Sequence, residues 1–144
     1  MSDAMSNYLE SAVIDHLFRA GTFAKPSAIY IGLIKFYEAD KVEAMTGTSV
    51  STAKEVSGGA YARIAVTQND DNWSAASAGG ATSNSNDLTF PTATADWGNV
   101  SGVFVADALT GGNLLLHGAL TTSRDVQDGD VFKFNAGDLD VTFT

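Results

Sequence analysis

Short apolar segments separated by glycine-containing turns fill the second half of the chain, and this pattern most constrains its fold. Turns are predicted at Ala108–Gly112 and Asp128–Asp130, and the run Asn135-Ala136-Gly137 predicts a hairpin. Strands are predicted between and beside these turns, at 97–107, 113–120, 131–134 and 139–144. Short strands at this spacing, joined by turns that contain glycine, are typical of an antiparallel β-sandwich or barrel.

The first half adds three strands and two long polar connections. Ala28–Phe36 is apolar on both alternating faces, which predicts a central strand that is buried on both sides. Further strands are expected at 61–66 and 88–90, the latter ending before Pro91 because proline cannot donate to a ladder. Residues 38–54 are predicted to form an exposed loop with one helical turn at 41–45, and 67–87 a surface connection held by Trp73.

One helix is expected near the N-terminus. Asn7 and Glu10 fit a capping box that begins the helix, and Gly21 is placed to end it with a positive φ. Leu9, Val13, His16 and Leu17 share one face. A helix of this length needs a packing partner, which is either the domain's own sheet or a neighbouring subunit.

These elements predict a mainly β fold. We expect an antiparallel β-sandwich of jelly-roll type, or a partly open barrel, with one N-terminal amphipathic α-helix. The 144 residues are enough for one domain that buries roughly 70% of its unfolded surface. We therefore expect a single domain over 1–144, in which 1–24 form an N-terminal arm and the helix.

The charge distribution argues against a nucleic-acid partner. The formal net charge is −9, and none of the eight basic residues lies between Arg63 and Arg124. Phosphate binding requires clustered basic side chains, so no nucleic-acid interface is expected. The absence of cysteine excludes disulfides and thiolate metal sites. We also expect no membrane span and no cleaved signal peptide, because no apolar run is long enough and the first residues are acidic.

No residue pattern predicts catalysis or a cofactor. The chain has no G-x-S-x-G motif, and its two histidines, His16 and His117, are expected to be ordinary core or interface residues. Asp125, Asp128 and Asp130 suggest a loop calcium site as an alternative, but Asp-Gly is common turn chemistry, so plain turns are preferred. We expect no catalytic residue, no cofactor and no metal.

The segment EVSGGAYARIAV, residues 55–66, places an arginine directly after a Gly-Gly turn. Gly58-Gly59 can adopt positive φ, and Tyr61 and Arg63 then share one strand face. Arg63 is expected to bind a carboxylate or turn carbonyls within the chain, with a contact to another subunit as the alternative. Both interpretations make the segment structural.

Five segments together resemble a family of short tailed-bacteriophage virion proteins, whose members are often labelled tail fibre or virion protein. They are SNYLESAVIDHLFR, AIYIGLIKF, EVSGGAYARIAV, LTFPTATADWGNVSGVFVAD and GGNLLLHGALTTSRDVQDGDVFKFNAGDLDVTF, and they cover most of 6–144. The resemblance implies a non-enzymatic building block of the phage virion, made in the host cytoplasm. Its implied partners are other virion proteins and further copies of itself.

Two roles in the virion are open at this point. The compact fold and the lack of fibre-like repeats favour an outer-capsid decoration or cement protein that binds the major capsid protein. The alternative is a tail fibre or another tail or baseplate component, and a module that binds carbohydrate through Trp73 and Trp97 belongs to this alternative. Subunit contacts are expected at the helix and at residues 38–54. The candidate contact residues are Tyr8, Phe18, Phe23, Arg63 and Trp73.

Overall fold

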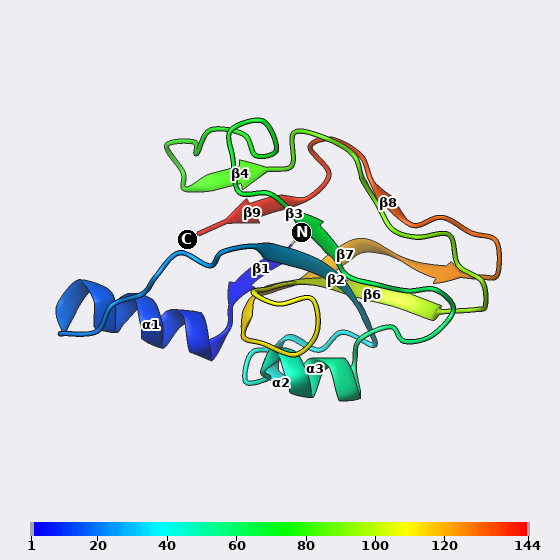
Figure 1. Cartoon of the computed structure of the whole chain (residues 1–144), viewed down its shortest axis with the longest axis horizontal. Helices are drawn as coiled ribbons and strands as arrows, with labels where there is room; N and C mark the ends of the chain where they lie inside the picture. The colour runs from blue at the N-terminus through cyan, green and yellow to red at the C-terminus, as the bar shows by residue number, and fades with distance from the viewer. Residues whose placement is uncertain (1, 144) are drawn as a thin grey trace.

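A computed structural model describes residues 2–143 (Figure 1). Its centre is a five-stranded antiparallel sheet in the order β1-β7-β6-β2-β3, and two two-stranded ribbons, β4-β9 and β5-β8, complete the β structure. The sheet strands are β1 (Ser2–Met5), β2 (Ile29–Lys35), β3 (Ile64–Val66), β6 (Gly98–Ala106) and β7 (Leu114–Val126). The ribbon strands are β4 (Ala81–Ser83), β5 (Leu88–Thr89), β8 (Lys133–Phe134) and β9 (Asp140–Thr142). The helices are α1 (Asn7–Phe18), α2 (Ala39–Val42) and α3 (Gly47–Ala53).

The main core lies between one face of the sheet and the segments that carry the ribbons. Sheet residues such as Leu33 and Val103 pack there against Phe90, Phe132 and Phe134. The rings of these three phenylalanines meet edge to face, with centroids 5.3–6.4 Å apart. This arrangement is the preferred one for aromatic pairs, and it fixes the ribbons on the sheet.

A smaller core covers the opposite face of the same sheet. Ile34, Phe104 and Leu114 pack there against Val42 of α2 and Val50 of α3. Because side chains alternate across a strand, neighbouring residues of β2 and β6 serve the two cores in turn. The prediction of a central strand buried on both sides is therefore confirmed for β2, which pairs with β6 and β3.

The mainly β, antiparallel fold with an N-terminal helix is confirmed, and the sheet is open rather than closed. The expected hairpin through 135–137 is wrong. The strands on either side of it do not pair with each other, since β8 pairs with β5 and β9 pairs with β4. The turn closes locally: the Asp138 backbone N–H donates to the Asn135 carbonyl at 2.9 Å, and Asp138 Oδ2 accepts hydrogen bonds from the backbone N–H and Nδ2 of Asn135, both at 3.0 Å.

The exposed loop expected at 38–54 is also wrong in part, because it contains α2 and α3. Thr46 and Ser49 form a reciprocal capping box that starts α3. Val42 and Val50, both fully buried, hold these short helices against the sheet. The signal was local: a Thr-x-x-Ser pair before a valine, in a segment otherwise dominated by polar residues.

The bounds of the N-terminal helix differ from those expected. Its N-cap is Ser6 rather than Asn7, and it ends at Phe18 with Arg19 as C-cap. Gly21 does not have a positive φ, so it does not terminate the helix as predicted. The residues before the helix form the edge strand β1, which pairs with Leu116–Ala119 of β7. Within residues 2–143, no helix combines the length and the hydropathy needed to cross a membrane.

Candidate assembly surface

The first turn of α1 is attached rigidly to the sheet. Ser6 is completely buried, and its backbone N–H donates to the Leu115 carbonyl at 2.9 Å. The Ser6 hydroxyl donates to the Leu114 carbonyl and accepts the backbone N–H of Leu9 at 3.2 Å. A serine N-cap of this kind satisfies an otherwise orphaned donor of the helix. These contacts with β7 therefore fix the direction in which α1 projects from the sheet.

The rest of α1 projects from the end of the sheet (Figure 1). Several of its apolar side chains are exposed. Leu9 is buried and Val13 packs on the main core, but the next apolar side chains do not reach it. Ile14, Leu17 and Phe18 are 55%, 66% and 81% exposed. They follow the i, i+3, i+4 spacing of one helical stripe, which we call the α1 face.

The chain after α1 folds back along the helix without covering this face. Arg19 Nε lies 3.3 Å from Asp15 Oδ1. The Phe23 backbone N–H donates to His16 Nδ1 at 3.2 Å. A Cβ at Gly21 would lie 2.8 Å from the Cβ of Asp15, so a residue without a side chain permits this return. These contacts hold the C-terminal end of α1 while leaving its apolar side chains in solvent.

The five residues predicted as subunit contacts fall into two groups. Tyr8 and Phe18 lie on α1 and are 43% and 81% exposed. Phe23 and Trp73 are half-buried and pack against the main core, and Arg63 is buried. The structure therefore brings only Tyr8 and Phe18 to one element, near its opposite ends. That these five residues contact another subunit stays a prediction.

Sequence reasoning missed Ile14 as a surface residue and assigned Leu17 to the packed face. The apolar residues of α1 occupy a wider arc of the helix than the part that packs on the main core. Leu9 and Val13 fill the contact with the core, and the apolar residues one turn further on have nothing opposite them. A broad arc on a short helix was the available signal, since a helix packed on one partner needs only a stripe.

Arg63 forms a buried ion pair that explains its place after the Gly-Gly turn. Its Nε and Nη2 donate to Glu55 Oε1 and Oε2, each at 2.9 Å. The two side chains are 2% and 5% exposed. The guanidinium also lies over the Phe104 ring, 4.9 Å from its centroid. A bidentate, charge-assisted pair of this geometry is strong and directional.

The remaining donors of Arg63 bind three backbone carbonyls. Nη1 donates to Ala108 at 2.8 Å and to Gly111 at 3.0 Å, and Nη2 donates to Gly47 at 3.1 Å. All five N–H groups are thus used within the chain, and they connect α3 with the loop between β6 and β7. The interpretation of a carboxylate and turn-carbonyl partner is confirmed.

Tyr61 extends this buried centre. Its hydroxyl donates to Glu55 Oε1 at 2.8 Å and accepts the backbone N–H of Leu33 at 2.9 Å. Burial, together with the negative charge of Glu55, raises the pKa of Tyr61 far above its ordinary value. Gly58 and Gly59 have positive φ, as expected for the turn that precedes Tyr61. Residues 55–66 therefore have a structural role and connect the main core with the smaller one.

The tryptophan, the histidines and the clustered aspartates considered above as binding or catalytic groups do not form a site. Trp97 is 2% exposed and its Nε1 donates to the Gly59 carbonyl at 2.9 Å, so it cannot serve as the sugar platform considered above. His117 is buried with Nδ1 2.8 Å from the Tyr37 hydroxyl, whereas His16 is exposed on α1. No group of three or more Asp, Glu, His or Cys able to hold a metal occurs in the part of the chain that the structure describes.

Comparison with known proteins assigns the chain to a phage family. No curated protein matches it significantly. A family model described as "Podophage GP4 fiber I protein gp80" matches residues 4–142, which is nearly the whole chain. The protein is accordingly a phage virion structural protein, and the family description favours the fibre role over capsid decoration. The chain belongs to the family of the podophage GP4 fiber I protein gp80.

Proposed function

We propose that the protein is a non-enzymatic building block of a podophage fibre and that its copies associate through the α1 face. The observation that carries the proposal is the exposure of Ile14, Leu17 and Phe18 on a helix whose base is fixed to β7. Large apolar side chains gathered on one protruding element mark interaction sites more often than isolated ones do. The fibre description of the family supports a role built on such contacts.

A second copy of the chain is the partner that fits the α1 face best. A stripe of i, i+3, i+4 apolar residues on one helix matches the same stripe on another, as in helix pairs and coiled coils. A net charge of −9 makes copies repel each other elsewhere on their surfaces. Association then requires an uncharged patch, and the α1 face carries no charged side chain among its three residues.

The proposal is tested by measuring the mass of the protein in solution. Sedimentation equilibrium of the wild-type chain should give an oligomer that dissociates on dilution. Leu17→Gln and Phe18→Gln should each weaken it at least about tenfold, because burying a large apolar side chain contributes roughly 1.5–3 kcal/mol. Phe36→Gln is the matched control, since Phe36 is 69% exposed but lies at the end of β2, away from α1.

The outcomes separate the alternatives. A wild-type protein that stays monomeric at every concentration, or that is dissociated equally by Phe36→Gln, would refute association through α1. Deleting residues 1–20 is a poorer test, because it removes β1 and the buried Leu9 together with the exposed residues. The glutamine variants leave both in place, so their thermal unfolding should match that of the wild type.

A further inference from the structure

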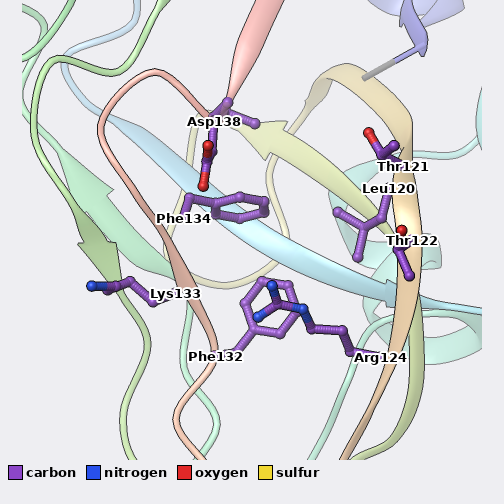
Figure 2. A pocket seen from close by; sticks show the side chains of 9 residues that line it. Leu120, Thr121, Thr122, Arg124, Phe132, Lys133, Phe134 and Asp138 are labelled. Atoms are coloured by element: carbon purple, nitrogen blue, oxygen red, sulfur yellow. The ribbon is translucent and has the colours of Figure 1, made fainter.

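An open groove of about 260 Å³ lies where the sheet and the β5-β8 layer separate. Figure 2 shows Leu120, Thr122 and Arg124 of β7 on one side and Phe132, Phe134 and Asp138 on the other. Thr121, Lys133 and Leu139 complete the lining. The rings of Phe132 and Phe134 and the side chain of Leu139 are almost fully buried and form its floor. The groove therefore opens onto the main core.

The β7 side of the groove carries polar residues, although the residues before and after them belong to the main core. Leu120 packs on the main core and Val126 is buried in it, two residues beyond Arg124. Thr121, Thr122 and Arg124, which lie between these two residues, line the groove instead. Departures of this kind from the core pattern are characteristic of functional positions.

An irregularity in the β6–β7 pairing presents these residues to the groove. The register passes from Val100↔Arg124 directly to Gly102↔Ala119, so the four residues 120–123 lie opposite Ser101 alone. Bulges re-aim side chains and are frequent beside binding sites. The same stretch lies beyond the pairing of β7 with β1, which ends at Ala119 for the described residues.

Arg124 supplies the groove with an unneutralised positive charge. Its guanidinium lies over the Phe132 ring, 5.5 Å from the centroid, and no carboxylate within residues 2–143 forms an ion pair with it. Of the carboxylates nearby, Asp87 lies 3.2 Å from Lys133 Nζ, whereas Asp138 accepts hydrogen bonds from the neutral Asn135 and keeps its negative charge. Lys25, Lys35 and Lys41 also form no ion pair within residues 2–143, but of the unpaired cations only Arg124 lines the groove.

We propose that this groove binds a carboxylate-bearing saccharide, with Arg124 as the group that recognises the carboxylate. The guanidinium fork matches a carboxylate bidentately, and its stacking on Phe132 pre-orients it. The hydroxyls of Thr121 and Thr122 can each donate and accept, which suits the hydroxyls of a sugar ring.

Other ligand classes fit the groove less well. An apolar ligand would leave Arg124 and the threonine hydroxyls without partners. Nucleic acid needs a row of cations, and the groove has only Arg124 and the already paired Lys133. An acidic peptide would bring a carboxylate, but the groove has room only for a compact group. This site and the α1 face lie on different elements, so either proposal can fail without the other.

The test is an amide chemical-shift titration of the full chain with methyl glucuronide, methyl glucoside and triglutamate. Methyl glucuronide should shift the amides of 120–124 and 132–139, and methyl glucoside should bind at least about tenfold more weakly, because it lacks the charge-assisted pair. Arg124→Gln should weaken glucuronide binding by a similar factor. Arg19→Gln, which removes another exposed arginine, on α1, should leave it unchanged.

Arg124→Lys separates recognition from folding. It retains the charge but not the fork, so it should bind glucuronide between the wild type and Arg124→Gln while its spectrum stays that of the folded chain. Equal affinity for glucuronide and glucoside, shifts confined to other regions, or the absence of any shift would overturn the proposal. Preferential binding of triglutamate would also overturn it and would identify the groove as a contact for another protein.

Discussion

Replacing Arg63 with methionine should destabilise the protein by about 3–5 kcal/mol, because it breaks a buried ion pair from one side. Methionine approximates the apolar stem but cannot donate. Glu55, whose side chain is 5% exposed, would retain only the hydroxyl of Tyr61 as a partner. The backbone carbonyls at positions 47, 108 and 111 would lose their donors as well.

Urea unfolding followed by tryptophan fluorescence measures this loss. With an m-value of about 2 kcal/mol/M, the midpoint should fall by about 2 M. Arg19→Met is the control, because the Arg19–Asp15 pair has side chains 75% and 52% exposed and should contribute less than about 0.5 kcal/mol. A loss below about 1 kcal/mol for Arg63→Met, or one equal to that of the control, would refute the assignment of Arg63 as a buried clamp.

The double variant Arg63→Met, Glu55→Gln distinguishes the ion pair from simple loss of packing. Removing both charges leaves no unpaired carboxylate, so the double variant should lose less than the sum of the two single losses. Strict additivity would mean that the two side chains contribute independently, which contradicts the 2.9 Å contacts between them.

Three further predictions concern the cores and the pH dependence of stability. Phe90→Ala should cost about 3–5 kcal/mol in urea unfolding, since Phe90 is 1% exposed and contacts three other aromatic rings. Gly47→Ala should cost about 1–3 kcal/mol, because its Cβ would lie 2.1 Å from the Gly111 carbonyl oxygen and force the two segments apart. Burial lowers the pKa of His117 below its ordinary value, against an opposing effect of Glu43, so the unfolded chain binds the proton more readily. The free energy of unfolding should therefore fall as the pH drops through about 6.5, the ordinary pKa of histidine, and His117→Gln should flatten that slope.

The strands of the sheet were largely predictable because their patterns are local. β2 reads as an apolar run, and β6 lies within the segment expected at 97–107, so both followed from alternation and flanking turns. β7 was predicted to end at residue 120 but continues to Val126. The residues from 121 to 125 are polar and exposed, so the apolar pattern ended before the strand did.

Pairing between distant strands was not predictable in the same way. A turn at 135–137 suggests a hairpin, but β8 and β9 pair with strands about fifty residues earlier, through Leu88↔Phe134 and Thr82↔Val141. Such partners are selected by the packing of the whole core rather than by the turn. The Arg63–Glu55 pair shows the same limit: an acidic partner could be expected, but its identity depended on how two segments meet in space.

The two proposed surfaces lie toward opposite ends of one strand, and this geometry has a consequence for assembly. The base of α1 is bound to Leu114 and Leu115 at the start of β7, and the groove is lined by residues up to Arg124 near its end. Along the partner strand β6 the same stretch runs only from Val105 to Val100, five residues or about 17 Å. In copies joined through α1, the grooves would thus lie on the sides away from the contact. Several grooves could then bind one polymeric saccharide together. If both proposals hold, disrupting the α1 face should weaken binding to a polymer of uronic acid far more than binding to methyl glucuronide, because only the polymer engages several grooves at once.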